Sequence, residues 1–169
     1  MSWIAYAILA YGLVAWVLPA PLALLHELGH ALPALALSRQ RVTVYVGRPP
    51  GRSASLGRLE LRVRLLNHPR WGWFGHVEGE SDTLTRGQAV VVIVGGPLMS
   101  ALVLAALLVG AAFVPWPATI LIWVPALAVA WQVLVTAVPM RYPRWFGPYA
   151  GRISDGYRIV SLLRASESE

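Results

Sequence analysis

Four long apolar runs, separated by shorter polar segments, constrain this chain more than any other feature. They cover approximately residues 3–18, 21–38, 88–114 and 119–138. A helix needs about 20 such residues to cross the hydrocarbon core of a membrane. Hydrophobic residues make up 57% of the chain and charged residues 13%, whereas about a quarter of a soluble domain is charged. We therefore expect a polytopic α-helical membrane protein with about four transmembrane helices, folded as a single domain over residues 1–169.

The arginines predict how the chain is oriented. All 14 basic residues are arginine, and they fall in residues 39–87 and after Pro139, while the short connections at 19–20 and 115–118 contain none. The positive-inside rule then places the N-terminus, the 39–87 region and the C-terminus in the cytoplasm of a multi-pass cell-membrane protein. Because these arginines lie between apolar runs, the net charge of +6 does not indicate nucleic-acid binding.

Two further features of composition indicate the source of the protein and exclude some kinds of site. The use of arginine without lysine is typical of GC-rich genomes and indicates a bacterial protein, and the lack of cysteine excludes disulfides and thiolate metal ligands. The first apolar run lacks the basic segment that opens a signal peptide, so we interpret it as a retained membrane helix.

The region between the second and third runs has a different pattern. Residues 41–47 and 56–66 alternate between apolar and polar side chains, which is typical of strands with one buried face. Residues 47–57 are rich in Gly, Pro and Ser and predict a turn between them, and residues 71–80 are a candidate third strand. We expect a small cytoplasmic or interfacial antiparallel β-sheet, inserted at about residues 40–80, and a short C-terminal helix after the last run.

The second apolar run contains ionisable side chains that need an explanation. His26, Glu27 and His30 lie within "LALLHELGHALPAL", residues 22–35. Each ionisable side chain at the membrane centre costs about 2.5–3.5 kcal/mol on insertion scales. Histidines four residues apart lie on one face of a helix and can bind one metal ion, while the adjacent glutamate can act on a metal-bound water. The pattern is the HExxH motif of zinc hydrolases and predicts a Zn²⁺ site with Glu27 as the general base.

A catalytic zinc also needs a third protein ligand. The residues alone leave this choice open, and Asp155 in "GRISDGYRIV" has the alternative role of N-cap to the last helix. The candidates are His68, His76, Glu60, Glu78, Glu80, Asp82 and Asp155.

Several of these motifs together resemble the site-2 protease family of intramembrane zinc metalloproteases. The resemblance rests on "HELGH" in a membrane helix, an arginine-rich β region, "GGPLMS" in the next run and a late "DG", and it covers about residues 20–160. It implies that His26, His30 and Asp155 bind zinc, that Glu27 is the catalytic base, and that membrane-spanning proteins are cleaved in or near the bilayer. Thr136 and Ser100 stand where the family often carries asparagine, and the resemblance assigns them to substrate binding.

The expected partners are a membrane-spanning protein substrate, the lipid bilayer and a regulatory membrane protein. Two other functions fit the same residues. One is a catalytically inactive membrane scaffold of the same fold, although that role does not need Glu27. The other is a metal transporter, although transporters often carry repeats that this sequence lacks. We also expect an edge of the sheet over residues 41–66 to hold unwound substrate by strand addition.

Overall fold

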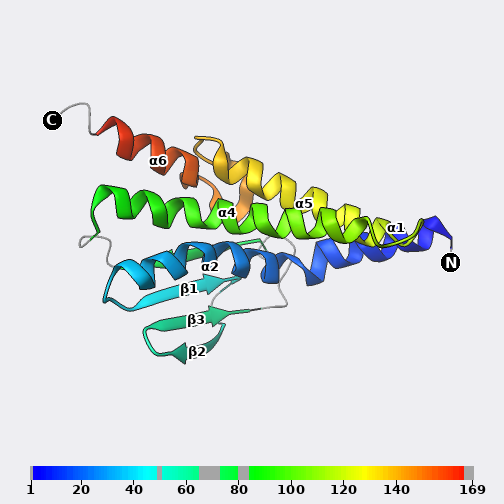
Figure 1. Cartoon of the computed structure of the whole chain (residues 1–169), viewed down its shortest axis with the longest axis horizontal. Helices are drawn as coiled ribbons and strands as arrows, with labels where there is room; N and C mark the ends of the chain where they lie inside the picture. The colour runs from blue at the N-terminus through cyan, green and yellow to red at the C-terminus, as the bar shows by residue number, and fades with distance from the viewer. Residues whose placement is uncertain (1, 49–50, 65–72, 80–83, 166–169) are drawn as a thin grey trace.

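The computed structural model describes residues 2–48, 51–64, 73–79 and 84–165. Helices run along the long axis of the molecule, and a small sheet lies against one of them (Figure 1). The elements in chain order are α1 (Trp3–Gly12), the π-helical turn η1 (Leu13–Val17), α2 (Pro19–Leu37), β1 (Val42–Val46), β2 (Arg52–Leu56), β3 (Leu59–Val63), β4 (Gly75–Glu78), α4 (Arg86–Ala111), α5 (Ile120–Ala137), the 3-10 helix η3 (Arg144–Tyr149) and α6 (Asp155–Arg164).

Three helices are long and apolar enough to cross a membrane, namely α2, α4 and α5. The sequence predicted four spans, and that number is wrong for the described residues. The first apolar run forms a shorter helix, Trp3–Val17, which at about 1.5 Å per residue is roughly 22 Å long and does not reach across a ~30 Å hydrocarbon core. Pro19 then occupies the first turn of α2 and begins a new helix there. The expected C-terminal helix is confirmed as α6.

Helices α2 and α4 approach each other through glycine. A Cβ atom built on Gly29 would overlap the Gly95 backbone and lie 2.7 Å from the Cβ of Met99, and one built on Gly95 would overlap the Gly29 carbonyl. Small residues allow membrane helices to pack at such short separations. This contact sets the distance between α4 and the face of α2 that carries the HExxH motif.

The sheet is mixed, with strand order β2-β3-β1-β4. Strand β1 pairs parallel with β3 and antiparallel with β4, while β2 and β3 form an antiparallel hairpin. The predicted all-antiparallel sheet is therefore wrong. The reason is that the expected turn contains β2, whose residues are all exposed and lie in a segment rich in Gly, Pro and Ser. The turn itself is at Gly57, which has a φ of 60°.

One face of the sheet packs on α2. Val42, Val44 and Val46 are almost fully buried and alternate with partly exposed residues along β1. They contact the small side chains Ala20 and Ala23 of α2, and the apolar positions of β3 join the same cluster. This packing places β4, an edge strand of the sheet, beside the HExxH helix.

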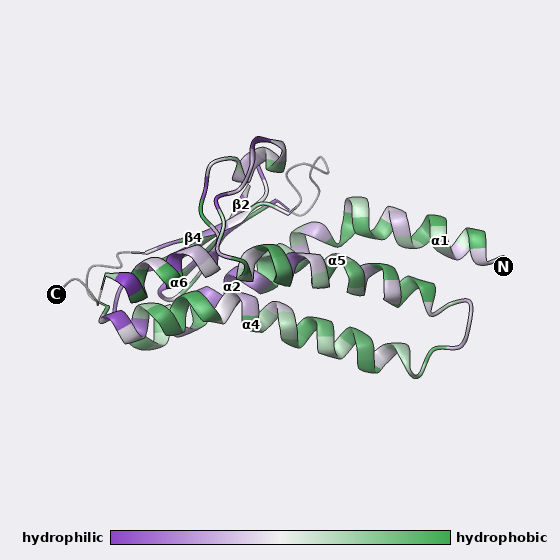
Figure 2. Cartoon of the chain, turned by 90° about the horizontal axis from the view of Figure 1, so that it is seen from above, coloured by the Kyte–Doolittle hydropathy of each residue, from purple (hydrophilic) through white to green (hydrophobic). Residues whose placement is uncertain are grey.

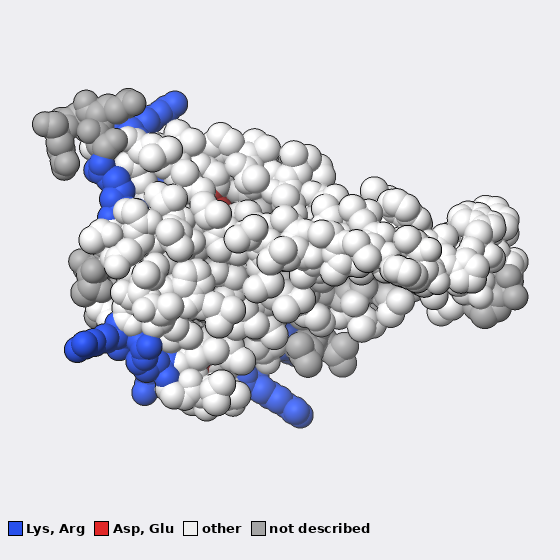
Figure 3. All heavy atoms as spheres, in the orientation of Figure 1, with Lys and Arg blue, Asp and Glu red and all other residues white. Residues whose placement is uncertain are grey.

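Polarity divides the molecule along its length. Apolar residues cover most of α1, α4 and α5, whereas polar residues gather in the sheet and near the start of α4 and α6 (Figure 2). On the face shown in Figure 3, basic side chains lie over the sheet and toward the C-terminal end of the molecule, away from the N-terminal end. This separation is what a membrane protein with one arginine-rich side requires.

The glycine contact predicts a sharp difference between two Gly→Ala substitutions. Gly29→Ala should destabilise the fold by about 1–3 kcal/mol, because the added methyl group meets backbone that cannot rotate away. Gly110→Ala in α4 meets no atom within 4 Å and should be neutral or stabilising by about 0.5–1 kcal/mol. Unfolding of both variants in detergent micelles measures this, and equal stabilities would contradict the proposed packing.

Candidate metal centre

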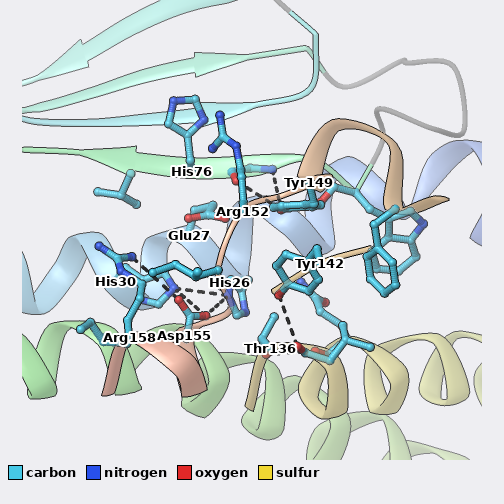
Figure 4. Close-up of a pocket in the computed structure, with 18 of the residues that line it drawn as sticks. His26, Glu27, His30, His76, Thr136, Tyr142, Tyr149, Arg152, Asp155 and Arg158 are labelled. Carbon is cyan, nitrogen blue, oxygen red and sulfur yellow. Dashed lines mark hydrogen bonds and ion pairs between the residues drawn. The ribbon is translucent and has the colours of Figure 1, made fainter. Parts of the chain in front are cut away.

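Two histidines of α2 and the first residue of α6 converge between the helices (Figure 4). The Nε2 atoms of His26 and His30 are 3.3 Å apart. The Oδ2 atom of Asp155 lies 3.3 Å from the first and 3.4 Å from the second. The three residues are only 4%, 6% and 9% exposed. Together they form a buried group that could hold a metal ion.

The outer nitrogens of both imidazoles are held by α4. The Nδ1 atom of His26 lies 2.9 Å from Ser100 Oγ, and that of His30 lies 2.8 Å from the Val92 carbonyl oxygen. A carbonyl can only accept a hydrogen bond, so His30 carries its proton on Nδ1, and Ser100 can accept from His26 in the same way. Each Nε2 then presents a lone pair toward Asp155. Fixing the tautomer of ligand histidines in this manner is a usual property of metal sites.

Glycine also makes room for the second histidine. A Cβ atom on Gly96 would overlap the His30 ring. The "GGP" segment of α4 therefore has two separate uses, because Gly95 contacts the α2 backbone and Gly96 accommodates the imidazole.

Asp155 arrives at this site through a closed excursion of the chain. Ser154 Oγ donates to the Val138 carbonyl at 2.6 Å and accepts from the Met140 N–H at 3.1 Å. A bridge between Arg141 and Ile153 joins the next pair of residues. The ends of the segment 140–154 thus lie side by side, and its length does not separate Asp155 from the end of α5.

The alternative role of Asp155 as a helix cap is wrong. The N-cap of α6 is Ser154, whose side chain accepts from the Tyr157 N–H, and Asp155 is the first helical residue. Gly156 allows the start of α6 to lie close to the end of α5, because a Cβ atom on Gly156 would overlap the Ala137 carbonyl. The Asp155 Oδ2 atom lies 3.3 Å and 3.4 Å from the Nε2 atoms of His26 and His30, where the two lone pairs converge. Asp155 therefore offers a carboxylate oxygen as a third donor beside the two imidazoles.

Glu27 lies next to this group and faces β4. It is 6% exposed, and a Cβ atom built on Gly75 would lie 2.6 Å from both its Cγ and its Oε1 atoms. A cavity of about 1240 Å³ opens here, lined by both histidines, Glu27 and Asp155 as well as by residues of β4 and η3. The carboxylate is thus held at the wall of this cavity, beside the three possible metal ligands.

The other predicted ligands that the structure describes are engaged elsewhere. His76 stacks on Tyr45 with ring centroids 4.5 Å apart and pairs with Glu78 at 3.1 Å. Glu60 pairs with Arg62 at 2.8 Å. The remaining candidates, His68, Glu80 and Asp82, lie outside the described residues.

The two predicted substrate-binding residues differ in position. Thr136 lines the cavity, and its hydroxyl donates back to the Gln132 carbonyl of its own helix at 3.0 Å. Ser100 is 3% exposed and contacts His26 instead. Contact of either residue with substrate stays a prediction.

Sequence reasoning did not identify Gly75 or Tyr149 as parts of this site. The Tyr149 hydroxyl lies 2.9 Å from the Gly75 nitrogen, and both residues line the cavity. Local pattern carried no signal for Tyr149, because its partner is 74 positions away. A glycine inside the candidate strand 71–80 is the one sign in the sequence of a close approach at Gly75.

Comparison with protein-family models, with curated proteins and with solved structures gives no significant match for this chain.

The geometry separates a ligand role for Asp155 from a capping role. Asp155→Ala should remove most of the bound metal, as His26→Ala should, because each leaves two donors in place of three. Thr85→Ala removes the N-cap of α4 instead, should cost about 0.5–2 kcal/mol of stability and should retain the metal, because it leaves all three donors in place. Elemental analysis of the purified variants measures the difference. Full metal content in Asp155→Ala would show that this carboxylate is not a ligand.

Proposed function

We propose that this protein is an intramembrane zinc endopeptidase that cleaves membrane-spanning proteins. The observation that carries the proposal is the buried convergence of His26, His30 and Asp155 beside Glu27, within a cavity bordered by apolar helices. The resemblance of the motifs to site-2 proteases points to the same reaction. The free-energy cost of placing four ionisable groups among such helices supports it too, because a single function in which all four take part would explain why they are there.

The donor set suits zinc. Tetrahedral zinc binds nitrogen and oxygen at about 2.0–2.2 Å, which places neighbouring ligand atoms about 3.3–3.6 Å apart. The three donor atoms are separated by 3.3, 3.3 and 3.4 Å. Two neutral imidazoles and one carboxylate leave a fourth position for water, as catalytic zinc sites do.

Different residues have different roles in the proposed reaction. Zinc bound here would supply Lewis acidity, which lowers the pKa of a water molecule and polarises a carbonyl group. Glu27 accepts a proton from the attacking water and delivers it to the leaving amine nitrogen, as a general base and then a general acid. Ser100 and the Val92 carbonyl keep the imidazoles oriented.

The distribution of arginines supports a proposed orientation of the chain in the membrane. We place the N-terminus, the sheet and the C-terminus on the cytoplasmic side of the cell membrane, so that substrate reaches the cavity from the bilayer at that face. The partner of the protein is then a membrane-spanning substrate, with a regulatory membrane protein as a further expectation.

The sequence placed the substrate edge within residues 41–66, where the edge strand is β2. The edge that borders the cavity is β4, and we propose β4 for substrate binding instead. Gly47 donates to the Phe74 carbonyl at 2.8 Å, and hydrogen-bonded pairs alternate along an antiparallel ladder. In the register of β1 and β4, His76 opposite Tyr45 is therefore a hydrogen-bonded pair, and the N–H and C=O groups of Gly75 and Val77 point away from β1. An unwound substrate needs backbone partners, and this outer edge borders the cavity.

Removing the proposed base tests the reaction. Glu27→Gln should lower cleavage of a model membrane substrate by about 10²–10⁴-fold while zinc content stays near the wild-type value, because the substitution leaves all three ligands in place. Product formation and elemental analysis on the same preparation measure both quantities.

Measurements of zinc content, cleavage and zinc flux also distinguish the protease from the inactive scaffold and the metal transporter. A wild-type protein that binds zinc but cleaves no membrane substrate supports the scaffold. Zinc flux into proteoliposomes that is lost in His26→Ala and kept in Glu27→Gln supports the transporter. Equal cleavage by wild type and Glu27→Gln contradicts the proposed mechanism.

A proline substitution at Val77 tests whether one backbone N–H on the outer edge of β4 binds substrate. Val77→Pro removes an N–H that β1 does not use, and Val77→Ala removes the packing of the side chain while keeping that N–H. We expect Val77→Pro to have a KM several-fold above that of Val77→Ala, because a hydrogen bond contributes about 0.5–1.5 kcal/mol, with equal zinc in both variants. Indistinguishable KM values would exclude strand addition at Val77.

A further inference from the structure

Tyr149 occupies the outer edge of β4 at one residue. Its hydroxyl accepts from the Gly75 N–H at 2.9 Å. The hydroxyl proton lies within reach of the Trp73 carbonyl at 3.0 Å and the Gly75 carbonyl at 3.2 Å. An added strand that paired at Gly75 would use the N–H and C=O groups of that residue. The side chain therefore takes the place of a strand residue at this position and leaves Val77 as the next outward-pointing residue of β4.

The occupied position is also the one beside the proposed base. Gly75 contacts Glu27 so closely that no side chain fits between them. Burial raises the pKa of Tyr149 well above its ordinary value, and the charge of Glu27 adds to this effect. The hydroxyl consequently stays protonated and keeps its capacity to donate.

The segment that carries Tyr149 holds it firmly. The 3-10 helix η3 ends at Tyr149, and its ring packs on Phe74 and Tyr142 with centroids 5.2 and 5.3 Å away. Arg152 lies over the Phe74 ring, 5.0 Å from its centre. Since both ends of the excursion 140–154 are joined, the hydroxyl is fixed relative to β4 and to Asp155.

We infer that Tyr149 is a positioning residue that ends the substrate strand on β4 at Gly75 and so fixes which peptide bond lies at Glu27. The inference rests on the proposed protease function. A substrate paired with Val77 must leave the sheet where the hydroxyl blocks Gly75, beside the carboxylate. Without the hydroxyl, Gly75 becomes a second pairing position, and strand pairing permits slips of two residues that keep the same face.

The test compares two tyrosines of the same excursion. Tyr149→Phe removes the hydroxyl from β4. Tyr142→Phe removes a hydroxyl that donates to the Val135 carbonyl of α5 at 3.3 Å and does not contact β4. Each variant is incubated in proteoliposomes with one model membrane substrate, and mass spectrometry maps the cleaved bonds. Amide hydrogen exchange over residues 73–79 and zinc content are measured on the same samples.

We expect wild type and Tyr142→Phe to cleave at one principal bond. Tyr149→Phe should add products cleaved two residues away, exchange several-fold faster at β4, and retain its zinc. A single unchanged cleavage bond in Tyr149→Phe, with kcat/KM equal to that of Tyr142→Phe, would overturn the inference while leaving the protease function intact. Absence of cleavage by the wild type would instead overturn the protease function and, with it, the role of Tyr149.

If Tyr149→Phe does not fold, Gly75→Ala provides the second variant. Its methyl group would meet Glu27 at 2.6 Å and leave the tyrosine in place. We expect a lower kcat with the wild-type cleavage bond and wild-type zinc content. A displaced cleavage bond in this variant would contradict the assignment of register to Tyr149.

Discussion

The close approach of α2 and α4 is the contact on which the rest of this structure depends. Gly29 and Gly95 bring the two backbones together, and Gly96 leaves the space that the His30 ring fills. At this separation the Val92 carbonyl and Ser100 reach the outer nitrogens of both histidines. The orientation of the two histidine side chains is therefore a consequence of how two apolar helices pack, and a bulkier residue at any of these glycines would disturb both.

A second layer of the site comes from segments that are far apart in the sequence. The sheet packs its valines on α2 and thereby carries β4 to Glu27. The excursion 140–154 closes on itself through Ser154 and delivers Asp155 to the histidines. Tyr149 joins the excursion to β4. The histidines, the carboxylates and the proposed substrate edge are thus held by one connected set of contacts around a single cavity.

The sequence predicted those parts whose physical cause is local. Helix periodicity places His26 and His30 on one face whatever surrounds them, and the apolar runs correspond closely to α2, α4 and α5. Strand β2 is not evident from the sequence, because its residues are all exposed and are flanked by turn-forming glycine and proline. Asp155 was assigned through family resemblance, since its closeness to His26 depends on hydrogen bonds across the excursion. Ser100 and Tyr149 show the same limit, because a hydroxyl carries no sign in the sequence of the distant group that it will contact.

The central claim is that His26, His30 and Asp155 bind zinc as a three-ligand site. X-ray absorption at the zinc edge, on protein purified in detergent without chelators, tests this most directly. We expect about one zinc per chain, with two imidazole nitrogens and oxygen donors at about 2.0–2.1 Å in a four-coordinate shell. A zinc-free protein, or a shell of oxygen atoms without the scattering of imidazole rings, would contradict it.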